Sequence, residues 1–177
     1  RTLLGLSVNV SPRRIEDDGF ASVVATALDA TKLTRDTLWL EITESVLIDD
    51  VDSTRARLLR LRTLGARLAL DDFGTGHSSL TYLRRFPVDA VKLDRSFVTG
   101  IQADGGDAAI VAAVVALAAT LDKRCIAEGI ECEDQVSALL AMGCRMGQGF
   151  LFAPPLTASE VSELLTRSLG QMPWPST

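Results

Sequence analysis

The sequence has few of the residues that build zinc sites or disulfide frameworks. It contains one histidine, and its three cysteines, Cys125, Cys132 and Cys144, show no Cys-x-x-Cys spacing. This usage is poor in ligands for structural zinc, and an odd number of cysteines fits a reducing compartment better than a disulfide framework. We therefore expect a cytoplasmic protein, although its parent protein can still be anchored in a membrane.

Positive charge is also scarce. The 177 residues include 18 Lys and Arg against 23 Asp and Glu, which gives a formal net charge of −5. Proteins that bind polyanions in general need clustered positive charge, so we expect no DNA partner. A substrate that contains phosphate is still compatible with this chain if metal ions supply positive charge.

Long apolar runs are absent as well. The longest covers residues 108–121, between Asp107 and Asp122, and is shorter than the roughly 20 residues that cross a bilayer. It predicts a buried helix instead. The length and the hydrophobic content of 47% indicate one folded domain. We place this domain at residues 1–170 and a proline-containing C-terminal tail at residues 171–177.

Short apolar runs alternate with amphipathic segments along the chain. Near-continuous apolar runs are typical of strands that are buried on both faces. The alternation predicts an α/β fold with a parallel sheet and crossover helices. The predicted strands are 6–10, 38–43, 67–71, 90–93, 124–127 and, more weakly, 149–152, and the predicted helices are 19–30, 51–64, 78–85, 107–121, 134–142 and 159–169.

Two α/β architectures fit this pattern, an open doubly wound sheet and a (β/α) barrel of the TIM type. No glycine-rich phosphate-binding fingerprint follows the first predicted strand, which favours the barrel. A closed barrel of this type has eight strands, whereas about six β/α units are present here. We therefore expect a TIM-type barrel that is incomplete at its N-terminus.

Nearly every predicted strand ends in a side chain that can bind a metal ion or move a proton. The carboxyl ends of parallel strands share one face, where barrel enzymes keep their catalytic residues. Because buried carboxylates are costly unless they are paired or metal-bound, this pattern predicts an active site. Its candidate residues are Asn9, Glu41, Glu44, Asp71, Asp72, Lys92, Asp94, Glu128, Glu131 and Gln148.

The candidate metal ligands are all oxygen donors. Asn9, Glu41, Asp71, Asp72 and Glu128 supply amide or carboxylate oxygens, which suit Mg²⁺ or Mn²⁺ better than zinc. Two adjacent aspartates can bridge two metal ions, an arrangement that activates water and neutralises a phosphoryl oxygen. The sequence thus favours a two-metal site for phosphoryl chemistry.

Other residues have candidate roles around these ligands. Lys92 could orient the attacking water, and Glu128 could accept its proton. Gly74, Thr75 and Gly76 follow the aspartates and form a loop whose glycines can adopt positive φ, so that it could close over substrate.

Each candidate can also have a purely structural role. Asn9 can cap a turn, and Glu44 can be a solvated acid at the entry to a helix. Lys92 can form an ion pair with Asp94, and Glu128 or Glu131 can cap a helix. Gln148 can simply form hydrogen bonds with backbone groups. His77 and Cys132 can have loop or packing roles.

Six sequence motifs carry these residues in a fixed order. They are Ser-Val-Asn-Val-Ser at 7–11, Glu-Ile-Thr-Glu-Ser at 41–45, Asp-Asp-Phe-Gly-Thr-Gly at 71–76, Val-Lys-Leu-Asp-Arg-Ser-Phe at 91–97, Ala-Glu-Gly-Ile-Glu at 127–131 and Gln-Gly-Phe-Leu-Phe at 148–152. In order and spacing they resemble the EAL domains, which are bacterial cyclic di-GMP phosphodiesterases. The resemblance covers nearly the whole chain.

The resemblance implies a modified TIM barrel that hydrolyses cyclic di-GMP to linear pGpG with Mg²⁺ or Mn²⁺. It implies Asn9, Glu41 and Asp71 as ligands of one metal, and Asp71, Asp72 and Glu128 around the second. By the same resemblance Lys92 contacts the nucleophilic water, Glu128 is the general base and Glu44 holds the loop 72–79. The supporting residues implied are Asp94, Glu131, Gln148, Gly74, Thr75 and Gly76.

The sequence departs from the family pattern at three points. His77 stands where the family usually has Tyr, and Cys132 where Thr is common. The name-giving Glu-Ala-Leu motif, whose Glu is a metal ligand, is not in this sequence, which starts at Arg1 rather than at Met. We therefore expect a longer parent chain with an upstream sensor or GGDEF-type domain, and a homodimer that covers the open sheet edges.

Two further functions are compatible with these residues. One is a non-catalytic module that binds cyclic di-GMP or has a regulatory role. The second, based on chemistry alone, is a Mg²⁺-dependent enolising barrel in which Lys92 abstracts a carbon-bound proton. The adjacent aspartates favour phosphoryl transfer over enolisation, because they suit two metal ions.

Overall fold

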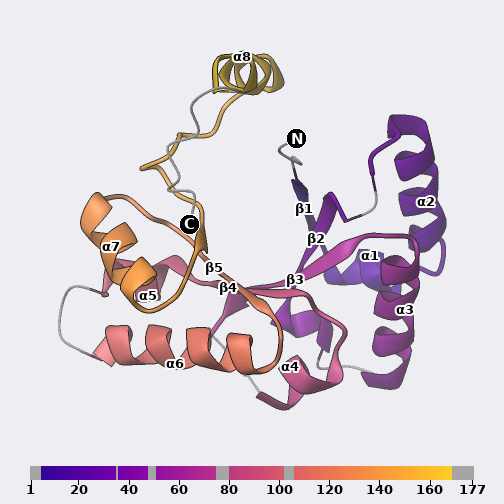
Figure 1. Ribbon diagram of the computed structural model, residues 1–177. Coiled ribbons are helices and arrows are strands. Elements are labelled where there is room, and N and C mark those ends of the chain that lie inside the picture. The colour runs from indigo at the N-terminus through magenta and orange to yellow at the C-terminus, as the bar shows by residue number, and fades with distance from the viewer. Residues whose placement is uncertain (1–4, 35, 48–50, 75–79, 102–105, 169–177) are drawn as a thin grey trace.

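The computed structural model describes residues 5–34, 36–47, 51–74, 80–101 and 106–168 (Figure 1). The described strands are β1 (Leu6–Val10), β2 (Leu38–Thr43), β3 (Arg67–Phe73), β4 (Ala90–Leu93), β5 (Arg124–Ala127) and β6 (Met146–Gly147). The helices are α1 (Pro12–Glu16), α2 (Phe20–Thr31), η1 (Glu44–Leu47), α3 (Val51–Thr63), α4 (Leu80–Arg85), α5 (Arg95–Thr99), α6 (Gly106–Thr120), α7 (Glu133–Ala141) and α8 (Ala158–Ser168).

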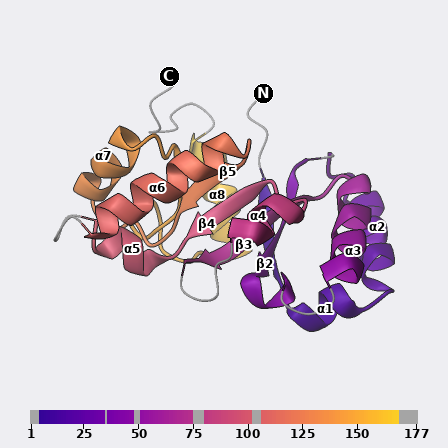
Figure 2. The ribbon, with the colours of Figure 1, turned by 90° about the horizontal axis from the view of Figure 1, so that it is seen from below.

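The strands form one parallel sheet whose spatial order is the chain order, β1-β2-β3-β4-β5-β6. A doubly wound sheet reverses its strand order at a switch point, and this sheet has no such reversal among its described strands. It curls into an incomplete barrel, with α2 and α3 beside β1 and β2 and with α5, α6 and α7 around β4 and β5 (Figures 1 and 2). The predicted fold, an incomplete TIM-type barrel, is confirmed.

The hydrophobic core lies between the strands and the helices in two clusters. The first joins the early strands to α1, α2 and α3 through side chains such as Ile42, Leu58 and Leu68. The second joins β4 and β5 to α6 and α7 through Leu93, Val111 and Leu139. All six side chains are nearly inaccessible to solvent. These two clusters fix the strands from outside and leave their carboxyl ends for polar groups.

The first five predicted strands are confirmed, but the sixth is wrong. The sequence predicts a strand at 149–152, whereas β6 pairs with β5 at Met146 and Gly147. From Gly149 the chain turns, because Phe152 N–H donates to Gly149 O at 3.1 Å. A Cβ on Gly149 would lie 2.1 Å from Ile130 O, so the backbone there approaches Ile130 too closely for another residue. The apolar run reflects exposed Phe150 and Phe152 rather than a buried strand.

The last described helix, α8, stands apart from the sheet and is amphipathic (Figure 1). Among the described residues, none of the helices combines the length and the apolar character that a membrane crossing requires. The predicted tail at 171–177 lies outside the described residues, as do Thr75, Gly76 and His77.

Candidate active site

The carboxyl ends of neighbouring strands bring the candidate residues to one rim. Asn9 on β1 is the register partner of Glu41 on β2. Asp71 on β3 is the partner of Thr43 on β2. Lys92 lies on β4 opposite Ile126, so that Glu128 follows the adjacent strand β5 on the same edge. The local cause is the parallel pairing itself, which aligns strand ends that are far apart in sequence.

Lys92 is the centre of this rim. Its Nζ lies 2.5 Å from Glu41 Oε2 and 3.0 Å from Asp71 Oδ1, and it also forms an ion pair with Glu128 Oε1. Only 3% of the Lys92 side chain is exposed. One ammonium therefore joins three carboxylates, and the cluster keeps an excess of negative charge.

The charge state of Lys92 follows from these contacts. Burial alone would lower the pKa of Lys92, but the hydrogen bonds that Lys92 donates to Glu128, Glu41 and Asp71 outweigh burial and raise the pKa above its usual value. Lys92 is thus a protonated ammonium at neutral pH. This disfavours the enolising barrel, in which a neutral Lys92 would abstract a proton. The alternative ion pair between Lys92 and Asp94 does not form, because Lys92 pairs with Glu41, Asp71 and Glu128.

Asp71, Asp72 and Glu128 form a group that fits a divalent cation. Each offers one carboxylate oxygen, and these oxygens lie within 4.8 Å of one another. Burial, followed by repulsion from Asp71 and Asp94, raises the pKa of Asp72. Burial also raises the pKa of Glu128, although Lys92 opposes the shift. A bound cation would offset the repulsion among these crowded carboxylates, so the donor set fits Mg²⁺ or Mn²⁺.

Asn9 and Glu41 adjoin this group on the first two strands. The Asn9 side chain is exposed at the rim. Glu41 is buried, and its Oε1 accepts a hydrogen bond from Ser7 Oγ while its Oε2 faces Lys92. Ser7 belongs to the first sequence motif, which gave it no role in the site. Its position two residues before Asn9 on the same strand was the available signal, because residues i and i+2 share one face.

Glu44 connects the second strand to the segment after the aspartates. Glu44 Oε1 accepts a hydrogen bond from Gly74 N–H at 3.4 Å. Gly74 has φ +102°, and a Cβ there would lie 2.7 Å from Phe97 Cε2, so both backbone conformation and space require glycine. Asp72 also has a positive φ of 54°. The chain therefore leaves β3 through a constrained turn next to Glu44.

The remaining candidates lie around a cavity beside the carboxylates. Gln148 Nε2 donates to Glu128 Oε1 at 3.0 Å. Asp94 caps α5 through Ser96 N–H at 3.0 Å, and this hydrogen bonding to Ser96 lowers the pKa of Asp94. Glu131 is exposed on the rim of the cavity. The cavity has a volume of about 630 Å³, and its lining includes Asp72, Asp94, Arg95, Glu128, Gln148 and Phe150.

The alternative in which Glu128 or Glu131 caps a helix does not hold for α7. The N-cap residue of α7 is the exposed Cys132. Gln135 supplies the reciprocal part of the cap, because its Oε1 accepts from Glu131 N–H at 2.7 Å and from Cys132 N–H at 3.2 Å. Both glutamates are thus left at the cavity.

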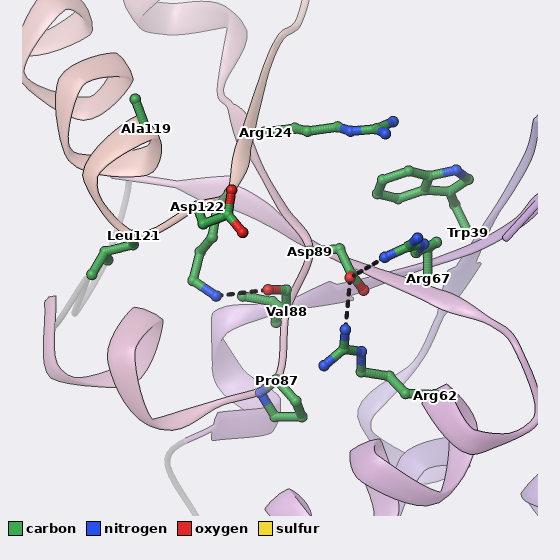
Figure 3. Close-up of a pocket in the computed structure, with 11 residues that line it drawn as sticks. Trp39, Arg62, Arg67, Pro87, Val88, Asp89, Ala119, Leu121, Asp122 and Arg124 are labelled. Atoms are coloured by element: carbon green, nitrogen blue, oxygen red, sulfur yellow. Dashed lines mark hydrogen bonds and ion pairs between the residues drawn. The ribbon is translucent and has the colours of Figure 1, made fainter.

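A second cavity lies at the opposite end of the strands (Figure 3). It measures about 500 Å³ and is rich in charged side chains. Asp89 Oδ1 accepts from Arg62 at 3.0 Å and from Arg67 at 2.8 Å, and the Arg124 guanidinium lies 5.5 Å from the centre of the Trp39 ring. Asp89 thus pairs with two arginines within this cavity, and the lining does not include the candidate catalytic residues that the structure describes.

Known proteins share both the sequence and the fold of this chain. The EAL domain profile matches residues 2–155. The cyclic di-GMP phosphodiesterase PA2567 of Pseudomonas aeruginosa is 41% identical over 93% of this chain and 28% of its own length. The chain spans between 20% and 28% of the first curated relatives that it matches.

Solved structures agree with the sequence matches. The crystal structure of the EAL domain of Mycobacterium smegmatis DcpA superposes with a TM-score of 0.88 and 44% identity, over 92% of this chain and 73% of that domain. A manganese and cyclic di-GMP complex of Klebsiella pneumoniae BlrP1 has a TM-score of 0.77 and 36% identity, over 83% of this chain and 38% of its own. The chain therefore belongs to the EAL domain family.

Proposed function

We propose that this chain carries the catalytic centre of a phosphodiesterase that hydrolyses cyclic di-GMP to linear pGpG with Mg²⁺ or Mn²⁺. The observation that carries the proposal is the meeting of Asp71, Asp72 and Glu128 within 4.8 Å beside a protonated Lys92. Relatives named as cyclic di-GMP phosphodiesterases support the choice of substrate, as does the manganese and cyclic di-GMP complex of BlrP1.

Divalent cations, when bound, would supply an activated water and neutralise charge on a phosphoryl oxygen. We assign Asn9, Glu41 and Asp71 to one cation, and Asp71, Asp72 and Glu128 to the other. Ser7 restrains Glu41 through the hydrogen bond to Oε1. These assignments place the cations at one end of the large cavity, where a dinucleotide phosphate can approach.

The other side chains act on the water and the substrate. Lys92 keeps its proton and donates to oxygen atoms, so its role is to orient the attacking water and to offset developing negative charge. Glu128 is the group that accepts the proton from this water, because its raised pKa brings it nearer the operating pH. Gln148 orients Glu128, and Glu44 holds the turn at Gly74.

Asp94, Glu131 and the loop residues Gly74, Thr75 and Gly76 are proposed as supporting residues around the substrate. An upstream sensor or GGDEF-type domain, a homodimer and a cytoplasmic location stay predictions.

Turnover and binding on the same sample test this function. The chain is incubated with cyclic di-GMP and Mn²⁺, and linear pGpG is separated by chromatography. Glu128→Gln should lower turnover by several orders of magnitude, whereas the matched Glu133→Gln, an exposed acid in the first turn of α7, should not. Calorimetric binding of cyclic di-GMP in Ca²⁺ without any turnover in Mn²⁺ would instead establish the non-catalytic module.

A further inference from the structure

Two of the three cysteines lie together behind the sheet, between β5 and the helices. Cys125 belongs to β5, and Cys144 lies two residues before β6. Ile126 on β5 is the register partner of Met146 on β6. Cys125 and Cys144 are therefore near neighbours on adjacent segments of the sheet. Cys144 Sγ lies 3.5 Å from Cys125 O and 3.4 Å from Met146 O. Cys144 is buried, and Cys125 is partly buried.

The two thiols also influence each other's ionisation. Their mutual interaction is the largest cause of the raised pKa of Cys125 and of the lowered pKa of Cys144. Backbone hydrogen bonds from Met146 and Ala127 add to the effect on Cys144. One thiol of such a pair ionises more readily and acts as the nucleophile, while the other is placed to react with it.

We propose that Cys125 and Cys144 form a reversible disulfide when the protein meets a peroxide, which makes this pair an oxidative modification site of the domain. The pair lies away from the catalytic rim, and none of the proposed catalytic steps uses it. Peroxide is close to water in size, so it suits a thiol that is buried behind a short strand. β6 is held to β5 at only two paired positions, and opening there would expose Cys144.

The proposed chemistry balances with one hydrogen peroxide per disulfide. The Cys144 thiolate attacks one peroxide oxygen, the O–O bond breaks, and the leaving hydroxide takes up a proton to become water. The sulfur of Cys125, which loses its proton, then attacks the sulfur of the Cys144 sulfenic acid, and the S–O bond breaks with release of a second water. Two thiols are oxidised to a disulfide, and the peroxide is reduced to two waters.

The consequence of the disulfide is a covalent tie between β5 and the segment that leads into β6. β5 is followed by Glu128, and β6 is followed by its partner Gln148. A cross-link between the chain segments that carry them restricts the opening of this edge of the sheet. The oxidised protein should therefore melt at a higher temperature than the reduced protein.

The experiment uses the Cys132→Ser variant, because Cys132 is exposed and would otherwise form intermolecular disulfides. Serine is a favoured N-cap residue, so α7 keeps its cap. The protein is treated with hydrogen peroxide, denatured, alkylated and digested after glutamate. Cleavage at Glu128, Glu131 or Glu133 separates the two cysteines unless a disulfide joins them. We expect one linked species that separates into two fragments after dithiothreitol.

Two controls make the result decisive. Oxidation of the exposed Cys132 in the unmodified chain shows that the peroxide was effective, and alkylation of both Cys125 and Cys144 under the same conditions overturns the proposal. A sulfinic acid on Cys144 beside an unmodified Cys125 also overturns it. In the double variant Cys125→Ser, Cys132→Ser, dimedone should trap a sulfenic acid on Cys144. In Cys132→Ser alone this adduct should be scarce, because Cys125 reacts with the sulfenic acid first.

Discussion

Gln148 Nε2 lies 3.0 Å from Glu128 Oε1, the oxygen that also pairs with Lys92 Nζ. Glu128 is therefore held from two sides, by an ammonium on β4 and by an amide that follows β6. Two donors on a single oxygen restrain the position of the carboxylate beside the aspartates. Proper orientation of Glu128 thus depends on three neighbouring parts of the sheet.

The first prediction concerns this orientation. Gln148→Ala removes a donor that favours the charged form of Glu128, so the pKa of Glu128 should rise further. Activity requires the deprotonated carboxylate, and the acid limb of the pH–rate profile should move to higher pH. We expect turnover to fall about fivefold, which corresponds to one lost hydrogen bond of about 1 kcal/mol.

The matched control for Gln148→Ala is Arg145→Ala, an exposed side chain three residues earlier. Its pH–rate profile should equal that of the unmodified chain. The pH–rate profiles of both variants come from steady-state rates with cyclic di-GMP and Mn²⁺ between pH 5 and pH 9. An acid limb that does not move in Gln148→Ala would show that Gln148 does not act through Glu128.

The second prediction concerns the buried charge of Lys92. Its folded pKa is raised above the ordinary 10.5, so its contribution to stability is fully present below that value and is lost as the pH rises through the folded pKa. Lys92→Ala leaves the buried carboxylates unpaired and should cost about 3–5 kcal/mol of the free energy of unfolding at pH 7 without metal.

The pH dependence of Lys92→Ala is a separate readout. Without Lys92 the pKa of Glu128 rises further, so the folded variant binds more protons than the unfolded chain, and the variant should recover stability as the pH falls from 8 to 5. Lys123→Ala is the control. It removes a partly buried lysine that donates to Val88 O at 2.7 Å, at the opposite end of the strands from Glu41, Asp71 and Glu128. Urea unfolding at several pH values gives the free energy of unfolding of both variants. If the free energy of Lys92→Ala changes with pH in the same way as that of Lys123→Ala, the predicted role of Lys92 is wrong.

The fold was largely predictable from the sequence because its strands are short apolar runs buried on both faces. The same argument failed at β6. A strand of two residues has no periodicity to detect, and the apolar residues that follow it, Phe150 and Phe152, are exposed in a turn. Only the tertiary approach of Gly149 to the backbone of Ile130 shows why the chain turns there.

The convergence of the site was predictable for a different reason. Parallel strands align their carboxyl ends, so Glu41, Asp71 and Lys92 had to meet once the sheet was inferred. The contacts within the site could not be inferred in this way. Spacing places Ser7 on the same face as Asn9. The hydrogen bonds of Ser7 to Glu41 and of Gln148 to Glu128, however, depend on side-chain geometry between strands.

The third prediction concerns Asp72. Burial and the neighbouring acids raise its pKa above the ordinary 3.8, so the folded state binds more protons than the unfolded state, and metal-free stability falls as the pH rises through that window. Asp72→Asn removes this cost. Because solvent screens this exposed carboxylate, the gain at pH 7 without metal should be on the order of 0.5 kcal/mol.

The same variant should lose the response to metal. Mn²⁺ should raise the melting temperature of the unmodified chain and should have little effect on Asp72→Asn. The matched control is Asp122→Asn, because Asp122 has the same φ of 54°, which asparagine also adopts readily, and it lies at the opposite end of the strands. An equal Mn²⁺ response in all three proteins would rule out Asp72 as a ligand.

The last prediction tests whether the charged cavity at the amino ends of the strands is structural. Asp89 Oδ1 binds two arginines, and its Oδ2 accepts from Leu68 N–H at 3.0 Å (Figure 3). Asp89→Ala removes the carboxylate that Arg62 and Arg67 share, leaves Arg67 with only the more exposed Asp36, and orphans a backbone donor, so it should cost about 1–3 kcal/mol.

Asp89→Asn separates the two contributions, because its amide oxygen can still accept from Leu68 N–H while the negative charge is lost. We expect its stability to lie between those of Asp89→Ala and the unmodified chain, and added salt should narrow the difference by screening the arginines. Urea midpoints measure stability, and turnover per folded molecule should stay unchanged in both variants. Loss of turnover at full stability would show instead that this cavity communicates with the carboxylate rim through the strands between them.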